Sequence, residues 1–245
     1  MTTDVALAGR AAAAAAEVLL RLRDGGLSGR ALGDAGDAAA QETISHALAR
    51  ERPEDVVFSE EALDDLRRLS AERVWIVDPL DGTREYREPG RHDWAVHVAL
   101  WAHGELSAAA VALPALGEML LTDPAPVPPA RAPGPVRIAV SRTRPPAVAD
   151  AVADALDAEL VPLGSAGYKT VAVARGEVDA YVHAGGMYQW DSAAPVAVAR
   201  AAGLTTCRID GSPLVYNVPD ASLPDLVVCR PELAEPILAA VRPRR

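Results

Sequence analysis

A short apolar run that ends in acidic residues constrains the fold of this chain more than any other feature. Residues 74–77 read Val-Trp-Ile-Val, and a run of β-branched and aromatic residues without alternation predicts a strand buried on both faces. Residues 78–83 follow directly and read Asp-Pro-Leu-Asp-Gly-Thr. Pro79 fixes a turn, and Gly82 permits close approach of the backbone to another group. The sequence therefore predicts a buried strand whose end carries Asp78 and Asp81.

Two carboxylates at a strand end suggest a metal and phosphate site. Asp78 and Asp81 are hard oxygen ligands of the kind that Mg²⁺ prefers. The backbone amides of Gly82 and Thr83 would point toward an anion if these residues open a helix. Asp-Pro and Asp-Gly pairs are also common turn formers, so these dipeptides by themselves favour a plain turn.

Composition limits the remaining possibilities. The chain has 245 residues, of which 50% are hydrophobic, enough for one large domain or two coupled layers. No apolar stretch approaches the roughly 20 residues that a membrane span requires, and the start Met-Thr-Thr-Asp lacks the basic residues of a secretory signal. Cys207 and Cys229 cannot form a disulfide framework. We therefore expect a cytoplasmic protein without membrane contact.

The charge balance bears on the binding partners. A net charge of -10 argues against a nucleic-acid polymer, because binding to a phosphate backbone depends on basic patches. A small anion remains compatible, since metal ions and local amides bind phosphate whatever the global charge. Lys169 is the only lysine, which suggests a role for a compact ammonium group, although it can equally be a chance survivor of a strong arginine bias.

Hydrophobic periodicity and turn residues predict an α/β (α+β) chain in two parts. Residues 1–122 form an N-terminal α+β metal-binding part, residues 123–135 a proline-rich linker, and residues 136–245 a C-terminal α/β part. Helices are expected over residues 5–23, 38–50, 62–69, 147–156, 164–175, 190–202 and 232–241. Strands are expected over residues 56–58, 74–77, 94–102, 105–114, 119–121, 136–140, 159–163, 178–183 and 226–229. Asp37 would be the N-cap of the second helix, and capping alone would account for it.

Three motifs resemble those of the inositol monophosphatase superfamily of Mg²⁺-dependent, lithium-sensitive phosphatases. Residues 78–83 are similar to its Asp-Pro-hydrophobic-Asp-Gly-Thr signature, residues 58–61 (Phe-Ser-Glu-Glu) to its acidic pair, and residues 190–194 (Trp-Asp-Ser-Ala-Ala) to its Trp-Asp-x-Ala-Ala motif. They occur in the order of the family. The resemblance implies the layered αβαβα sugar-phosphatase fold. Pro195 and Ser59 depart from the family pattern, which usually has glycine at both positions.

The same resemblance implies roles for individual residues. Two or three Mg²⁺ ions would be held by five groups: Glu60, Asp78, Asp81, Asp191 and the carbonyl of Leu80. The implied catalytic residues are Asp37, Thr83 and Glu60. Asp37 lies 23 residues before Glu60, which is the family's separation for the aspartate that partners the signature threonine. Glu61 would be either a ligand of a third ion or a solvated residue.

The flanking residues indicate which phosphate ester is hydrolysed. Residues 84–86 (Arg-Glu-Tyr) resemble the form found in bacterial 3'(2'),5'-bisphosphate nucleotidases, and the longer pattern resembles the actinobacterial CysQ type. These enzymes remove the 3'-phosphate from 3'-phosphoadenosine 5'-phosphate, a by-product of sulfate assimilation. The substrate-binding residues implied are Gly82, Thr83, Ser165, Lys169, His183 and Asp191. The alternatives are an inositol-1-phosphatase or fructose-1,6-bisphosphatase, a promiscuous enzyme, and a phosphometabolite-binding protein without turnover. A homodimer is possible.

Overall fold

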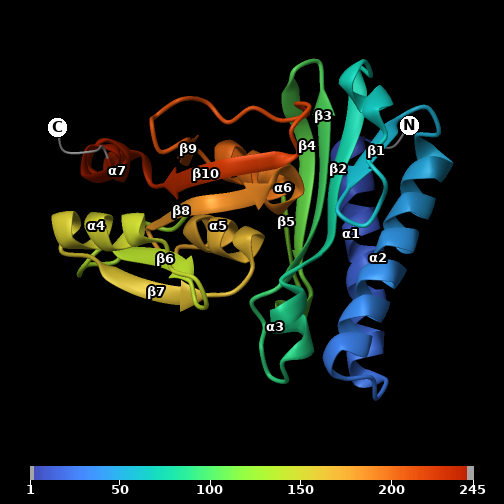
Figure 1. The fold of residues 1–245 in the computed structure, drawn as a ribbon, viewed down its shortest axis with the longest axis horizontal. Helices are drawn as coiled ribbons and strands as arrows, with labels where there is room; N and C mark the ends of the chain where they lie inside the picture. Colours follow the sequence, from blue (N-terminus) through green and yellow to red (C-terminus); the bar gives the residue numbers. More distant parts are fainter. Residues whose placement is uncertain (1–2, 242–245) are drawn as a thin grey trace.

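Two five-stranded mixed sheets and the helices around them form the layers of the protein. The computed structural model describes residues 3–241 (Figure 1). The first sheet has the strand order β1-β2-β3-β4-β5 and the second β7-β6-β8-β10-β9. The strands are β1 (Val56–Ser59), β2 (Arg73–Asp81), β3 (Ala95–Ala102), β4 (Glu105–Leu113), β5 (Glu118–Leu121), β6 (Arg137–Ser141), β7 (Glu159–Leu163), β8 (Ala180–Tyr188), β9 (Thr205–Cys207) and β10 (Ser222–Cys229).

The helices cover the outer faces of both sheets and fill the space between them. They are α1 (Asp4–Asp24), α2 (Gly29–Glu51), α3 (Thr83–Arg87), α4 (Ala147–Leu156), α5 (Ala166–Ala174), α6 (Gln189–Ala201) and α7 (Ala234–Val241), with short 3₁₀ turns η1 (Leu66–Leu69), η2 (Pro114–Leu116) and η3 (Pro231–Leu233). Helices α1 and α2 lie on the outer face of the first sheet, α5 and α6 lie between the sheets, and α4 and α7 cover the second sheet (Figure 1). The expected layered αβαβα fold is confirmed. Within residues 3–241, no helix is both long and apolar enough to cross a membrane.

Strand β2 shows why the layers form. Its alternate side chains enter two different cores: Val74 and Ile76 belong to the cluster between the sheets, and Trp75 and Val77 to the cluster beneath α1 and α2. Side chains of a strand point alternately to opposite faces, so a continuous apolar run is what a strand covered on both sides requires. The prediction for residues 74–77 is confirmed.

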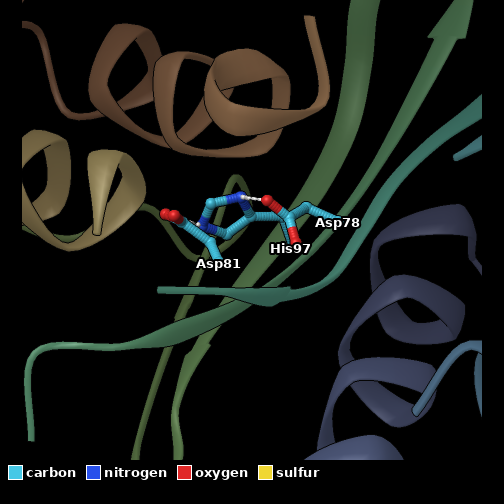
Figure 2. A group of neighbouring side chains, drawn as sticks. All are labelled: Asp78, Asp81 and His97. Carbon is cyan, nitrogen blue, oxygen red and sulfur yellow. Dashed lines mark ion pairs between the residues drawn. The ribbon is translucent and has the colours of Figure 1, made fainter. Parts of the chain in front are cut away.

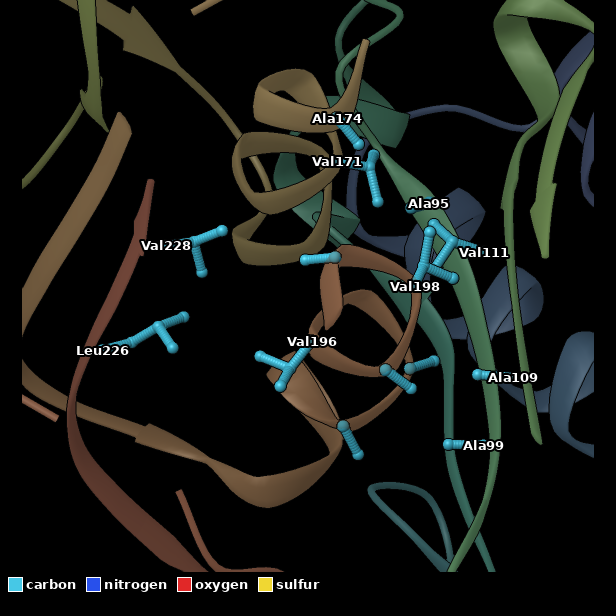
Figure 3. Packing of buried hydrophobic residues seen from close by; sticks show 14 of the residues in the cluster. Ala95, Ala99, Ala109, Val111, Val171, Ala174, Val196, Val198, Leu226 and Val228 are labelled. Atoms are coloured by element: carbon cyan, nitrogen blue, oxygen red, sulfur yellow. The ribbon is translucent and has the colours of Figure 1, made fainter. Parts of the chain in front are cut away.

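Small side chains allow α6 to pack closely against both sheets. The cluster between the sheets contains alanine and valine residues from β3, β4, α5, α6 and β10 (Figure 3). Among these, Val196 and Val198 of α6 are fully buried. Such close packing leaves little freedom for the first turn of α6, which begins at the Trp-Asp motif.

Two expectations about helices are wrong. Helix α2 begins at Gly29, so Asp37 lies inside the helix and Ser28 occupies the N-cap position. Residues 24–37 were expected to lie outside a helix, but Gly33 and Gly36 are needed for packing of α2. A Cβ atom at Gly36 would lie 2.8 Å from the ring of Tyr86, and one at Gly33 would lie 2.9 Å from the Thr83 methyl group. Tertiary packing overrides the low helix propensity of glycine here.

The expected helix over residues 62–69 is only the 3₁₀ turn η1, at residues 66–69. Leu63 is 97% exposed and Leu66 is 64% exposed, so little apolar burial stabilises a longer helix. The side chain of Asp65 accepts a hydrogen bond from the Arg67 backbone amide at 3.0 Å and starts the short turn instead.

Several boundaries differ in the second half. Strand β9 was not expected, and β8 continues five residues beyond its expected end, to Tyr188, through Gly185 and Gly186, both with positive φ. Residues 123–135, the expected linker, contain no helix or strand and connect β5 to β6. The division into separate parts at this linker stays a prediction. One hydrophobic core includes residues from both sheets, so the two parts pack against each other.

Candidate active site

The end of β2 places two acidic side chains on the same side of the sheet. In a regular strand, residues three apart point to opposite faces, but the pairing of β2 with β3 is irregular between Asp78 and Asp81. Such an irregularity re-aims side chains and is common near functional sites. Asp78 is almost completely buried, and its Oδ1 accepts a hydrogen bond from the Leu80 amide at 3.0 Å.

His97 lies between these two carboxylates, as Figure 2 shows. Its Nε2 is 3.4 Å from Asp81 Oδ2, and its Nδ1 is 4.0 Å from Asp78 Oδ2. Potential ligand atoms of the three residues all lie within 4.8 Å of one another, so the group could hold a metal ion. The Nδ1 atom is also 3.2 Å from the carbonyl oxygen of Trp190. Sequence reasoning assigned no role to His97.

The buried His97 Nε2 has no hydrogen-bond partner among the described residues. Burial lowers the pKa of the imidazole, against the opposing charge of Asp81, which favours the neutral ring. A neutral ring that donates from Nδ1 to the Trp190 carbonyl presents the lone pair of Nε2 toward the carboxylate of Asp81. Two acceptors that face each other inside the protein are unfavourable unless a cation lies close to both. The nitrogen of His97 and the carboxylate of Asp81 are therefore suited to bind a metal ion.

Helix α5 fixes the side chain of Asp81. The carboxylate accepts hydrogen bonds from the Ser165 hydroxyl and the Gly167 amide, both at 2.5 Å, and from the Ala166 amide at 3.2 Å. A Cβ atom at residue 167 would lie only 1.9 Å from His97 Nε2. Glycine at position 167 therefore allows the first turn of α5 to lie directly against both His97 and Asp81.

Glu60 and Asp191 complete a set of mutually repelling carboxylates. Burial, followed by the charges of Asp191 and Asp81, raises the pKa of Glu60 to about 8. Burial and the charge of Asp81 raise the pKa of Asp191 to about 7. Burial raises the pKa of Asp78 well above its ordinary value, and the charges of Asp81, Glu60 and Asp191 add to this. Clustered carboxylates of this kind are stabilised by cations.

Thr83 connects this cluster to Asp37. The Thr83 hydroxyl is 3.4 Å from Asp37 Oδ1 and 3.2 Å from the carbonyl oxygen of Leu80. Burial and then the charge of Glu61 raise the pKa of Asp37 to about 6. Glu61 is therefore close enough to act on the site electrostatically. Gly82 is the N-cap residue of α3 and has a φ of +89°, a conformation that favours glycine.

A pocket of about 190 Å³ is lined by four of the six predicted binding residues, Ser165, Lys169, His183 and Asp191, but not by Gly82 or Thr83. The Lys169 ammonium donates to the carbonyls of Ser165, at 2.6 Å, and Gly164, at 3.1 Å. Burial lowers its pKa to about 8, although nearby carboxylates oppose the shift. His183 Nε2 is 3.0 Å from the Gly186 carbonyl oxygen. A larger cavity of about 650 Å³ between α1 and residues 86–92 contains none of the predicted site residues.

Residues 2–124 and 134–244 match the sequence model described as the inositol monophosphatase family. This chain belongs to the inositol monophosphatase family. The family is metal-dependent, which agrees with the group formed by Asp78, Asp81 and His97.

Two sequence relatives and one solved structure from this family are informative. The chain is 50% identical to the 3'-phosphoadenosine 5'-phosphate phosphatase of Mycobacterium leprae, over 98% of this chain and 94% of the relative. It is 53% identical to the Mycobacterium tuberculosis protein of the same name, over 86% of this chain and 82% of the relative. The crystal structure of CysQ from Bacteroides thetaiotaomicron superimposes with a TM-score of 0.81 at 26% identity, covering 91% of this chain and 96% of that chain.

Proposed function

We propose that this chain is a Mg²⁺-dependent phosphomonoesterase that hydrolyses the 3'-phosphate of 3'-phosphoadenosine 5'-phosphate to give AMP and inorganic phosphate. The observation that carries the proposal is the group formed by Asp78, Asp81 and His97, whose potential ligand atoms lie within 4.8 Å of one another. Glu60 and Asp191 lie close enough to interact with it, because burial and then the charges of the other carboxylates raise their pKa values. The mycobacterial relatives named for this activity support the choice of substrate.

The donor set favours Mg²⁺. Oxygen atoms from Glu60, Asp78, Asp81, Asp191 and the Leu80 carbonyl outnumber the single imidazole nitrogen of His97, and Mg²⁺ prefers oxygen ligands. Four carboxylates are more than one divalent ion neutralises, so we propose two or three ions. When bound, they polarise the phosphate and lower the pKa of a water molecule.

Thr83 and Asp37 then act on the attacking water. The Thr83 hydroxyl can donate to Asp37 and accept a hydrogen bond from water, so it orients the nucleophile. Asp37, with a pKa raised to about 6, is a stronger base than an exposed aspartate and accepts the proton through Thr83. Glu60 is both a metal ligand and a catalytic residue in this proposal. The backbone amides of Gly82 and Thr83 bind the phosphate, and no phosphoenzyme is formed.

The test is phosphate release from 3'-phosphoadenosine 5'-phosphate, inositol 1-phosphate and fructose 1,6-bisphosphate under increasing Mg²⁺. The nucleotide should have the highest kcat/KM, and EDTA should abolish release. Asp81→Asn should remain folded and be nearly inactive. A clear preference for either other substrate would replace the nucleotidase proposal with a sugar or inositol phosphatase. Binding of all three without release would indicate a non-catalytic protein.

A further inference from the structure

Two arginines that line the 190 Å³ pocket, Arg84 and Arg144, have no carboxylate partner within residues 3–241. Arg84, next to Thr83 on α3, and Arg144, on the turn after β6, both line the pocket and are exposed. Within residues 3–241, neither guanidinium has a hydrogen-bonded or ion-paired carboxylate. The chain has ten more acidic than basic residues, so two arginines without such partners on one small pocket leave a local excess of positive charge.

Arg142, which lines the same pocket, does form ion pairs, and these link the turn after β6 to α3 and the residue that follows it. Its Nε donates to Glu85 at 2.6 Å and its Nη2 to Glu88 at 2.5 Å, while its backbone amide donates to the Leu163 carbonyl at 3.1 Å. Arg142 therefore neutralises Glu85, the acidic residue of this wall, and anchors the turn that carries Arg144 to the segment after Thr83.

Lys169 adds a third positive charge, but from a buried position. It is 4% exposed, and two of its three N–H groups are directed at backbone carbonyls. Arg144 and Lys169 both act electrostatically on His183, because their charges contribute to lowering its pKa after the effect of burial. Arg144 and Lys169 are therefore both close enough to His183 to act on it, and Asp191 lines the same pocket.

We propose that Arg84 and Arg144 form the subsite for the second phosphate group of the substrate, the one that is not hydrolysed. This inference rests on the proposed function and names its specificity residues. A volume of about 190 Å³ is smaller than the usual range for a whole ligand, which fits a single phosphate at one end of the substrate. Arginine binds phosphate through two parallel N–H groups, and unpaired guanidinium groups need no existing ion pair to be broken first.

The test compares wild type, Arg144→Gln and, as a matched control for the loss of one charge, Arg21→Gln on α1. Arg21 is exposed and its nearest carboxylate, Glu17, is 3.7 Å away. Substrates are 3'-phosphoadenosine 5'-phosphate and adenosine 3'-monophosphate, which lacks the second phosphate. A charge-assisted hydrogen bond implies a fall of about ten- to a hundredfold in kcat/KM on the bisphosphate, mainly through KM, with a much smaller change on the monophosphate. Arg21→Gln should change neither.

Calorimetric binding of AMP and adenosine, with Mg²⁺ present, gives a second readout. AMP keeps the 5'-phosphate, so Arg144→Gln should weaken its binding about tenfold or more and leave adenosine binding unchanged. Arg84→Gln should weaken AMP binding in the same direction. Equal AMP affinities for wild type and both variants would overturn the subsite.

The two proposals fail in different ways. If wild type hydrolyses the bisphosphate no better than the monophosphate, the second phosphate has no subsite, while the phosphatase proposal stands. If wild type does not hydrolyse the bisphosphate at all, the proposed function is wrong, and the AMP measurement alone decides the subsite.

Discussion

Replacing Asp191 by asparagine should stabilise the metal-free protein, although the change removes a predicted metal ligand. Burial and the charge of Asp81 raise the pKa of Asp191 to about 7. A carboxyl group with a raised pKa in the folded state favours folding while it is protonated. In the unfolded chain the same carboxyl group has the ordinary aspartate pKa of about 3.8. The free energy of unfolding therefore falls as the pH rises from about 4 to about 7.

The magnitude follows from the pKa shift. One pKa unit corresponds to about 1.4 kcal/mol, so the full shift would correspond to about 4 kcal/mol at pH 8. The gain will be smaller because the neighbouring carboxylates titrate together. Asparagine keeps a side-chain oxygen for the Tyr188 amide, which bonds Asp191 at 2.8 Å. We expect Asp191→Asn to raise the free energy of unfolding by about 1 to 3 kcal/mol at pH 8.

Urea unfolding in EDTA at pH 5 and pH 8 measures the effect. The gain should be largest at pH 8 and should shrink at pH 5, where the wild-type carboxyl is mostly protonated. Asp225→Asn is the matched control. Burial opposes ionisation of Asp225, but hydrogen bonds from Arg208 and the Ile209 amide outweigh it and lower the pKa, so this change should destabilise the protein at pH 8.

Mg²⁺ should reverse the order of the two proteins. A ligand that binds only the folded state raises the free energy of unfolding by an amount that grows with the logarithm of its concentration divided by Kd. Wild type, which keeps the full ligand set, should therefore gain more than Asp191→Asn as Mg²⁺ increases. The reasoning is refuted if Asp191→Asn is no more stable than wild type at pH 8 in EDTA while Asp225→Asn is destabilised as expected.

Two further predictions concern the nucleophile and the packing beside it. Thr83→Ala and Asp37→Asn should each lower kcat far more than they raise KM. Because both residues act on one water, the double variant should be little worse than the more damaging single change. Steady-state kinetics in which the two losses multiply would contradict this. Gly167→Ala should lower the free energy of unfolding by about 1 to 3 kcal/mol, since its Cβ would lie 1.9 Å from His97 Nε2. Adding His97→Ala should recover part of that loss in urea unfolding, and no recovery would locate the clash elsewhere.

The layered fold was predictable because the strands that build it have short-range signals. The apolar run at residues 74–77 indicated a strand covered on both faces, and its alternate side chains do enter two cores. Residues 147–156 and 159–163 showed clear helix and strand periods, and α4 and β7 have those bounds. These signals depend on local sequence and burial, which a single chain reveals.

The position of Asp37 was harder to predict because the decisive contacts are distant in sequence. Gly33 and Gly36 have low local helix propensity. Because glycine has no side chain, Gly33 can lie against Thr83 and Gly36 against Tyr86, residues about fifty positions further along the chain. No local rule separates a glycine that breaks a helix from one that allows close packing, so the expected start of α2 was nine residues late.

His97 was missed for a similar reason. A single histidine in the apolar run of residues 94–102 is most often a satisfied core residue, and only the pairing of β3 with β2 places it opposite Asp78. The available signal was its position in the strand expected over residues 94–102, the next strand along the chain after the acidic strand end. Residue spacing alone could not show that Nε2 faces Asp81.

The bonds of Asp81 also change how Ser165 is understood. The sequence suggested that Ser165 binds substrate, and that role stays a prediction. In the structure its hydroxyl donates to Asp81 at 2.5 Å and accepts from the Tyr168 amide at 2.8 Å. Because a hydroxyl has only one hydrogen, a substrate could use just its remaining lone pair, and that lone pair would not attract an anionic phosphate. Under the subsite proposal, the positive charge for the second phosphate comes from Arg84 and Arg144, neither of which has a hydrogen-bonded or ion-paired carboxylate within residues 3–241.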